Sequence, residues 1–228
     1  SGMKKLISFA LWGTDPKYTQ GALKNAYAAP THYPDWICRY YCASDADPKV
    51  VNELKTLKHV EVVDLDAAGD WKFSINRFLP ISEDDIERVI CRDCDSRFSD
   101  RETQAVKQWI DSGKIFHVMR DHPWHGNYPV LAGMFGMLGN WNLDIRTLFN
   151  LMDNQVYYGC EQAFMAQYVW PLVEHDAVVH DEIFHDCPFP TTRKGLEYVG
   201  EPFGPDDKPC EIGHRDILKN FLDNKNVK

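Results

Sequence analysis

Two aspartates separated by one residue, Asp93 and Asp95, are the side chains in this sequence whose type and spacing most clearly suggest chemistry. They follow a short apolar segment, and Arg92 and Arg97 flank them. Two carboxylates at a strand end can hold one hard divalent cation, and Mn²⁺ or Mg²⁺ accepts such a pair together with phosphate oxygens and water. The flanking arginines would add positive charge where a diphosphate lies. The alternative interpretation is an acidic turn that leads into a helix capped by Asp100.

The segments around this pair alternate between strand-like and helix-like patterns. Short apolar or β-branched runs predict strands at residues 5–11, 36–42, 60–65, 88–92, 114–119 and 177–180. Helical spacing and terminal prolines or glycines predict helices at residues 20–29, 48–57, 100–112 and 160–173. This alternation is typical of an α/β fold with a mainly parallel central sheet flanked by helices. Ligands of such sheets bind beyond the carboxyl ends of the strands, where Asp93 and Asp95 would lie.

Beyond residue 120 the alternation fades, and the C-terminal half is predicted to be irregular. Residues 126–139 are rich in glycine and methionine. Residues 186–210 hold five of the thirteen prolines and predict an ordered loop that wraps the domain. Since no repeat or linker interrupts the sequence, we expect one domain over residues 3–228, with Ser1 and Gly2 as the remnant of an expression tag.

The charge and the composition argue against several classes of function. Lys plus Arg number 25 and Asp plus Glu 34, which gives a formal net charge of −9 and disfavours binding to nucleic acid or to anionic membranes. No apolar segment is long enough for a membrane span, and no secretory signal precedes the first predicted strand. The seven cysteines are therefore expected to be reduced thiols of a cytoplasmic protein. Neither a G-x-G-x-x-G nor a Walker A sequence occurs, which disfavours dinucleotide and P-loop nucleotide binding.

A second group of functional residue types follows the fifth predicted strand. Asp121 and His122 could bond sugar hydroxyls, and Trp124 could stack on a sugar ring. Gly133 would let the backbone approach a sugar, or would simply allow close packing. The alternatives are a packed loop with satisfied histidines, or a zinc site begun by His122 and His125 that would still need two further ligands.

The pattern of these residues resembles the metal-dependent glycosyltransferases of GT-A fold, which carry a D-x-D sequence at the end of their fourth strand. Residues 7–13 resemble the strand whose end cradles the nucleobase, and residues 76–79 resemble the arginine-bearing helix before the D-x-D strand. Residues 158–162 contain an acidic-Gln pair similar to one that meets the sugar, and residues 178–180 resemble the strand whose histidine completes the metal site. The resemblance spans roughly residues 5–185 and extends to small glycosyltransferase domains of polysaccharide loci and large algal viruses.

The resemblance implies a GT-A-like fold and a role for each of these positions. Residues 3–120 would bind a nucleotide-diphosphate sugar, with a UDP-sugar favoured, and residues 121–228 would face a glycan or glycoprotein acceptor. The implied donor-binding residues are Ala10, Leu11, Trp12, Gly13, Arg77, Arg92, Asp93 and Arg97. Gln162 would contact the sugar, and the cation, Mn²⁺ or Mg²⁺, would be held by Asp93, Asp95 and His180.

The chemistry of glycosyl transfer suits such a site. An oxocarbenium-like transition state places negative charge on the leaving diphosphate, and a preorganised cation offsets that charge. If the anomeric centre is inverted, a carboxylate must also remove the proton of the acceptor hydroxyl. Glu161 is the first candidate for this base, Asp153 is the second, and Asp181 is a third. Two other classes stay open: a nucleotidyl or phosphosugar transferase on a similar sheet, and a non-catalytic sugar-binding domain.

Overall fold

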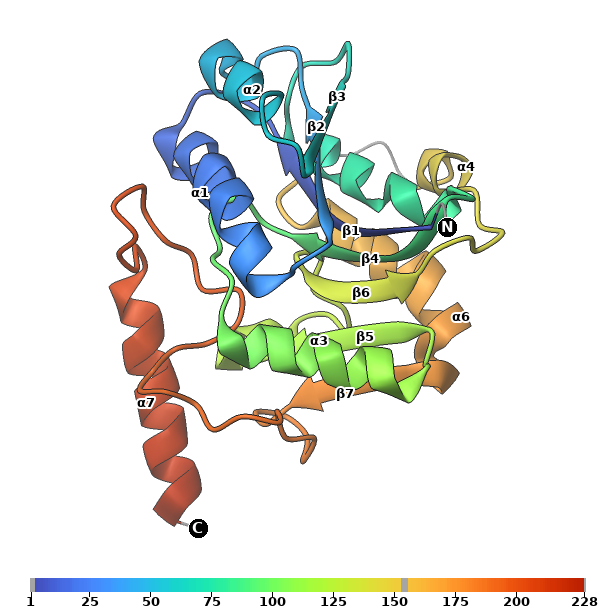
Figure 1. Cartoon of the computed structure of the whole chain (residues 1–228). Coiled ribbons are helices and arrows are strands. Elements are labelled where there is room, and N and C mark those ends of the chain that lie inside the picture. Colours follow the sequence, from blue (N-terminus) through green and yellow to red (C-terminus); the bar gives the residue numbers. More distant parts are fainter. Residues whose placement is uncertain (1–2, 153–155, 228) are drawn as a thin grey trace.

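The computed structural model describes residues 3–152 and 156–227, and its centre is a seven-stranded sheet (Figure 1). The strands are β1 (Lys4–Leu11), β2 (Ile37–Cys42), β3 (Val60–Asp64), β4 (Ile86–Arg92), β5 (Phe116–Arg120), β6 (Met134–Leu138) and β7 (Ala177–Asp181). Their order across the sheet is β3-β2-β1-β4-β6-β5-β7. Neighbouring strands are parallel except around β6, which runs antiparallel to β4 and to β5. The predicted α/β fold with a mainly parallel sheet is therefore confirmed.

Helices cover both faces of this sheet (Figure 1). One face carries α1 (Pro16–His32), α2 (Pro48–Leu54) and α3 (Asp100–Ser112). The other face carries the 3₁₀ helix η1 (Trp71–Ser82), α4 (Ile145–Asn150) and the continuous run of α5 (Cys160–Phe164), the π-helical turn η3 (Met165–Val169) and α6 (Trp170–Val173). Short 3₁₀ turns, η2 (Pro123–Gly126) and η4 (Glu174–Asp176), lie after β5 and before β7. Among the described helices, none is long and apolar enough to cross a membrane.

The central strands feed an apolar core on each side of the sheet. In β1, Ile7 and Phe9 point to the core beneath α1 and α2, whereas Leu6 points to the core beneath η1 and α5. A strand buried on both faces has no polar side to alternate with its apolar side, so it reads as a continuous apolar run. This property made β1 and β4 recognisable in the sequence.

The sequence did not predict β6, which lies between β4 and β5. Its glycine, Gly136, sits against the Trp109 ring of α3, and a Cβ at that position would come within 2.7 Å of the ring. Glycine is a poor strand former, so its presence in the segment masked the strand. Because β6 is antiparallel, it brings residues 130–133 to the same edge of the sheet as the carboxyl end of β4.

Helix α1 continues past the point where the sequence predicted its end. A stop before Pro30 was expected because proline cannot donate to the carbonyl four residues earlier. The helix nevertheless runs to His32, and the carbonyl oxygen of Ala26 is contacted at 2.6 Å by Nε2 of His59. That imidazole N–H replaces the missing backbone donor, so the proline is tolerated.

The bounds of α3 agree with the prediction, but its cap does not. Ser99, and not Asp100, is the N-cap, since its hydroxyl accepts the backbone N–H of Glu102 at 3.2 Å. At the other end, Gly113 adopts the left-handed conformation that closes many helices.

The proline-rich segment is ordered and wraps the end of the sheet, as predicted. We call residues 186–211 the C-terminal strap. The backbone N–H of Phe203 donates to the carbonyl oxygen of Asp95 at 2.8 Å, and Asp207 accepts from Arg97 at 2.9 Å and from Lys24 at 2.7 Å. The strap is thus fastened to the segment that carries the paired aspartates. It leads into α7 (Ile212–Val227), a helix that the sequence did not predict and that projects from the body of the molecule (Figure 1).

Two buried histidines join β5 to β7. His117 Nε2 lies 2.7 Å from His180 Nδ1, and His180 Nε2 lies 2.6 Å from Oε1 of Gln108. Because the Gln108 oxygen can only accept, His180 carries its proton on Nε2 and accepts from His117 through Nδ1. Burial lowers the pKa of His180 to about 4. Burial also lowers the pKa of His117 well below its ordinary range, with a smaller contribution from His180. Both rings are therefore neutral in the folded protein.

This neutral pair predicts a loss of stability in acid. The folded-state pKa of each ring lies below the ordinary value of 6.5, so the unfolded chain binds protons that the folded chain does not. The free energy of unfolding should fall as the pH drops from 6.5 towards 4, and His180→Gln should flatten this slope by up to about 1.4 kcal/mol per pH unit. Urea unfolding between pH 4.5 and 7.5 measures it, with the exposed His175→Gln as the control. Parallel curves for His180→Gln and the wild type would contradict the assignment.

Candidate functional site

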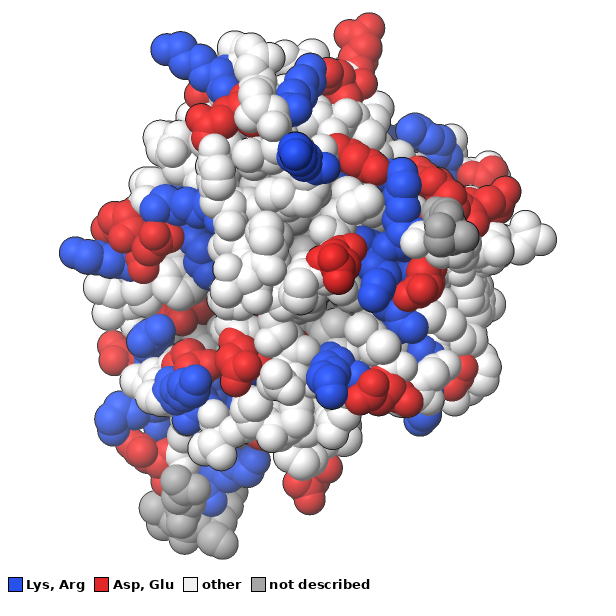
Figure 2. Space-filling model, viewed as in Figure 1, with Lys and Arg blue, Asp and Glu red and all other residues white. Residues whose placement is uncertain are grey.

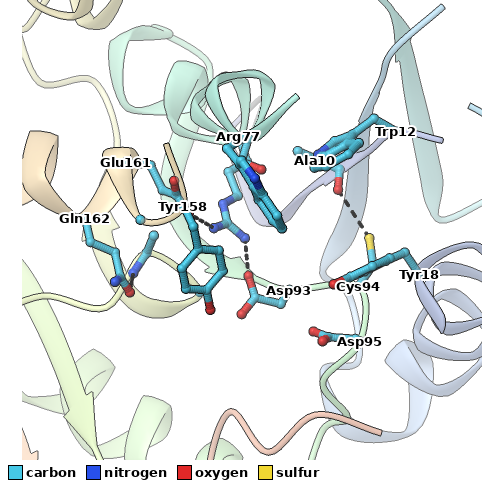
Figure 3. A pocket seen from close by; sticks show the side chains of 15 residues that line it. Ala10, Trp12, Tyr18, Arg77, Asp93, Cys94, Asp95, Tyr158, Glu161 and Gln162 are labelled. Atoms are coloured by element: carbon cyan, nitrogen blue, oxygen red, sulfur yellow. Dashed lines mark hydrogen bonds and ion pairs between the residues drawn. The ribbon is translucent and has the colours of Figure 1, made fainter. Parts of the chain in front are cut away.

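A cavity of about 150 Å³ opens beyond the carboxyl ends of β1 and β4, at the edge of the sheet where ligands were expected (Figure 3). Five separate parts of the chain form its wall. The first runs from the end of β1 into the start of α1, and the others are η1, the turn after β4, the segment before β6 and the start of α5. The lining residues are Ala10, Trp12, Tyr18, Trp71, Ser74, Arg77, Asp93, Cys94, Asp95, Ala132, Gly133, Tyr158, Gly159, Glu161 and Gln162.

The paired aspartates both face this cavity, and each has a basic partner. Asp93 Oδ1 accepts from Nη1 of Arg77 at 2.6 Å, and Asp95 Oδ2 lies 3.5 Å from Nζ of Lys17. Burial and the neighbouring Asp93 carboxylate together raise the pKa of Asp95 to about 6, and Lys17 opposes both effects. The pair therefore concentrates negative charge in a partly desolvated place.

Helix α1 fixes the turn that carries the two aspartates. The side-chain amide of Asn25 donates to the carbonyl oxygens of Cys94 at 3.2 Å and Ser96 at 2.9 Å. One turn earlier, Gly21 packs so closely that a Cβ there would lie 2.1 Å from the Cys94 carbonyl oxygen. The close approach needs a residue without a side chain, which explains a glycine inside a helix.

Arg77 connects the aspartate pair to the acid on α5. Arg77 is only 4% exposed, and its Nη1 also donates to the carbonyl oxygen of Arg92 at 3.0 Å. Nη2 lies 3.7 Å from Glu161 Oε1, so one guanidinium lies between Asp93 and Glu161 (Figure 3). Its backbone is held as well, because the Ser8 hydroxyl on β1 donates to the Arg77 carbonyl at 2.7 Å.

Glu161 and Gln162 occupy the first turn of α5 on the far wall of the cavity. The Glu161 side chain is 14% exposed, and burial raises its pKa, although Arg77 opposes the shift. Gln162 Oε1 accepts the backbone N–H of Ala132 at 3.4 Å. The neighbouring Gly133 is required by space, since a Cβ there would come within 2.4 Å of the Asp93 carboxylate. Glu161, Gln162 and Gly133 thus line the same cavity as Asp93, and the roles predicted for them stay predictions.

Three aromatic rings form a further wall of the cavity. Trp12 and Trp71 meet edge to face with centroids 5.3 Å apart, and Trp71 meets Tyr158 in the same way at 5.0 Å. Tyr158 is 80% exposed, so its ring is available to a ligand. Asp45 holds the backbone on both sides of Trp12, because its carboxylate accepts the backbone N–H of Gly13 at 3.2 Å and that of Gly69 at 3.0 Å.

Sequence reasoning missed several members of this wall. Tyr158 is the first residue of the segment 158–162 that contains Glu161, so its proximity in sequence could have indicated it. Trp71 and Tyr18 carried no such signal, because a lone aromatic residue in a helix more often packs in a core. Among the four residues predicted at the end of β1, Ala10 and Trp12 line the cavity, whereas Leu11 is buried in the core and Gly13 forms the turn.

Two predicted donor-binding arginines do not line the cavity. Arg92 is buried on the opposite face of β4, where Nε donates to Glu102 at 2.9 Å and Nη1 to the carbonyl oxygen of Cys91 at 2.8 Å. Arg97 is bound to the C-terminal strap through Asp207. Both positive charges have internal partners, and Arg77 is the arginine that reaches Asp93.

Asp121 serves the structure and not the cavity. It is fully buried, and its two oxygens accept from Arg101 at 2.9 Å each, from Arg193 at 2.7 Å and from the backbone N–H of Val199 at 2.8 Å. Two charged partners leave it with no oxygen for a sugar hydroxyl. It joins α3 and β5 to the C-terminal strap, which corrects the prediction of a sugar contact.

The adjacent histidines are also engaged in the protein. His122 Nε2 donates to the carbonyl oxygen of His214 at 2.7 Å, and its Nδ1 accepts the backbone N–H of Trp124 at 3.0 Å. His125 Nδ1 accepts the backbone N–H of Asp121 at 2.9 Å. These contacts oppose both the zinc interpretation and a sugar contact by His122. Trp124 does not line the cavity but is 60% exposed, so its stacking on an acceptor sugar stays a prediction.

The predicted third metal ligand and one candidate base lie away from the cavity. Both ring nitrogens of His180 are occupied by His117 and Gln108, so it does not join Asp93 and Asp95. In residues 3–152 and 156–227, no three His, Cys, Asp or Glu side chains gather closely enough to hold a metal. Asp181 is fully buried and accepts from Arg120 and two backbone N–H groups, which removes it as a base. Asp153 lies outside the described residues.

The charged residues visible in Figure 2 include both signs, and no large part of that face carries basic residues alone. Acidic and basic side chains alternate around the rim, and uncharged surface occupies much of the centre. A nucleic-acid-binding surface instead gathers basic residues on one face or along one helix. The distribution agrees with the formal net charge of −9 in disfavouring such a partner.

The packing of Gly21 gives a testable prediction. Gly21→Ala should lower the free energy of unfolding by about 1–3 kcal/mol, because the new Cβ overlaps the Cys94 carbonyl and forces α1 from the aspartate turn. Gly213→Ala is the matched control in another helix, since its Cβ would meet nothing within 4 Å. The control should leave stability unchanged or raise it, because alanine is the better helix former. Equal stabilities of the two variants in urea unfolding would contradict the close approach.

Comparison with known proteins identifies the fold. No protein-family model matches the chain, and no curated protein matches it either. Among solved structures, the galactosyltransferase LgtC in complex with donor and acceptor sugar analogs is 14% identical, with a TM-score of 0.53 over 96% of this chain and 95% of that one. A glycosyltransferase involved in the glycosylation of the major capsid of PBCV-1 is 16% identical, with a TM-score of 0.50 over 78% of this chain and 81% of that one. The chain therefore has the GT-A-like fold of these structural neighbours.

Proposed function

We propose that this protein transfers a sugar from a nucleotide-diphosphate sugar, with a UDP-sugar favoured, to a glycan or glycoprotein acceptor. One observation carries the proposal: Asp93 and Asp95 face the same cavity as Glu161, and buried Arg77 lies between the two groups. Acids for a cation, a candidate base and an aromatic wall thus share one site of a GT-A-like fold. The structural neighbours support this choice, since one was solved with donor and acceptor sugar analogs and another acts in capsid glycosylation.

The aspartate pair fits a hard divalent cation such as Mn²⁺ or Mg²⁺. Both carboxylates line the cavity, and their mutual repulsion together with burial raises the pKa of Asp95, so added positive charge would stabilise both. Asp93 and Asp95 would hold the cation, with donor phosphate oxygens and water completing its coordination. A cation bound there would offset the negative charge that develops on the leaving nucleoside diphosphate.

The other residues of the cavity have roles that follow from their positions. Arg77 fixes Asp93 in place, because its own side chain is buried and bonded to a backbone carbonyl. Glu161 is the base that we assign for an inverting reaction: burial raises its pKa, which strengthens it as a proton acceptor. Gln162 on the same turn would bond the transferred sugar, and the rings of Trp12, Trp71 and Tyr158 offer a surface for the nucleobase or the sugar.

The decisive assay is turnover with a panel of nucleotide sugars in the presence of Mn²⁺. The double variant Asp93→Asn with Asp95→Asn should lose metal-dependent donor hydrolysis and transfer by about 100-fold or more, because the developing phosphate charge is no longer offset. The matched control is Asp84→Asn with Asp85→Asn, two exposed acids that directly precede the first residue of β4. This control should keep the wild-type rate.

The outcomes separate the proposed function from the alternatives. Unchanged turnover in the Asp93 and Asp95 variant would exclude the cation mechanism. Release of pyrophosphate from a nucleoside triphosphate and a sugar phosphate would instead indicate a nucleotidyl transferase. A non-catalytic sugar-binding domain would show no turnover, and nucleoside diphosphate would not raise its melting temperature in the presence of Mn²⁺.

A further inference from the structure

Each carboxylate of the aspartate pair already contacts one cation of the protein. Arg77 Nη1 lies 2.6 Å from Asp93 Oδ1, and Lys17 Nζ lies 3.5 Å from Asp95 Oδ2. The two positive charges match the two carboxylates of the pair, and Glu161, 3.7 Å from Nη2 of Arg77, adds a third carboxylate to the same cavity. A divalent cation at the pair would compete with Arg77 and Lys17 for the same carboxylate oxygens, so one of the resident cations must give way.

The two resident cations differ in how firmly they are held. Arg77 is buried, and Nη1 also donates to the Arg92 carbonyl at 3.0 Å, so it cannot move without unfolding its surroundings. The Lys17 side chain is 28% exposed, and its 3.5 Å separation from Asp95 is longer than an ordinary hydrogen bond. Its ammonium sits on a flexible four-carbon stem, close to the ring of Tyr18. Lys17 is thus the cation that can leave.

The place of Lys17 also allows it to reach a donor. It lies in the first turn of α1, which follows β1 at the edge of the sheet where the cavity opens, and the adjacent Tyr18 lines that cavity. The Lys17 backbone is anchored, because its N–H donates to the side chain of Asp15 at 3.0 Å. A fixed backbone with a mobile ammonium can exchange one nearby anion for another without a change in the fold.

We propose that Lys17 is an exchangeable counter-ion: it neutralises Asp95 while the site is free, yields Asp95 to the divalent cation, and then contacts the donor diphosphate. This inference rests on the proposed function. The exchange conserves charge, because a nucleotide-sugar diphosphate brings about as much negative charge as the cation brings positive charge. Lys17 moves from a carboxylate to a phosphate, and no charged group is left alone in the cavity. The device couples cation binding to donor binding.

The test measures Mn²⁺ binding by electron paramagnetic resonance of the free ion, first without nucleotide and then with UDP. Lys17→Met should bind Mn²⁺ alone about threefold more tightly than the wild type, because the competing ion pair is gone. With saturating Mn²⁺, the same variant should bind UDP about tenfold more weakly, because a charge-assisted contact to the diphosphate is lost. The matched control is Lys24→Met on the same helix, whose ammonium pairs with Asp207 at 2.7 Å and should match the wild type in both measurements.

The outcomes distinguish failure of the exchange from failure of the proposed function. If Lys17→Met binds Mn²⁺ no more tightly than the wild type, or binds UDP equally well, the exchange is wrong. In that case Asp95→Asn should still weaken Mn²⁺ binding, so the cation site itself would stand. If Asp95→Asn and the wild type bind Mn²⁺ equally, the cation does not bind at the pair, and the proposed function and the exchange both fail. Circular dichroism of each variant shows that the fold is intact.

Discussion

The site depends on the ion pairs that the buried guanidinium of Arg77 makes with Asp93 and Glu161. The guanidinium joins three elements that are distant in sequence: η1, which carries it, the turn after β4, which provides Asp93, and α5, which provides Glu161. A buried charge needs hydrogen-bonded partners, and loss of one partner from such a pair is strongly destabilising. The arginine therefore fixes the distance between the acids and makes their convergence a condition of folding.

The rest of the fold supports this convergence from outside the cavity. Helix α1 presses the aspartate turn into place through Gly21 and Asn25, and the C-terminal strap bonds the carbonyl of Asp95 from the other side. The antiparallel β6 brings Gly133 against the carboxylate of Asp93. Each contact is made to the backbone of the turn or depends on a glycine, so backbone hydrogen bonds and close packing hold the aspartate turn in place. The ligand-facing charges are left to Arg77 and Lys17, of which one is fixed and the other is mobile.

The sequence revealed the parts of the molecule that depend on local patterns. Strands buried on both faces gave continuous apolar runs, and the place of Asp93 and Asp95 after one of them correctly indicated the end of a central strand. The partners of charged side chains were harder to predict, because residue type does not indicate whether a charged group faces a cavity or pairs with another charged group. Asp121, Asp181 and Arg92 all satisfy buried internal partners.

The other wrong or missing predictions concern residues whose places are set by tertiary contacts and not by the local sequence pattern. His180 lies on a strand near the expected place, but its ring is turned to His117 and Gln108. The strand β6 was hidden by Gly136, whose presence reflects contact with a tryptophan from a distant helix. The contribution of Trp71 to the cavity arises from the fold of η1 against β1, which no spacing within the sequence encodes.

The central claim is that Asp93 and Asp95 hold the cation that brings a nucleoside diphosphate to this cavity. The most direct measurement is a crystal structure of the protein soaked with Mn²⁺ and UDP, with anomalous diffraction to locate the metal. We expect an anomalous peak bonded to the Asp93 and Asp95 carboxylates and to the diphosphate, with the nucleoside in the cavity bounded by Trp12 and Tyr158. UDP bound without a metal at these two carboxylates, or a manganese peak elsewhere in the molecule, would contradict it.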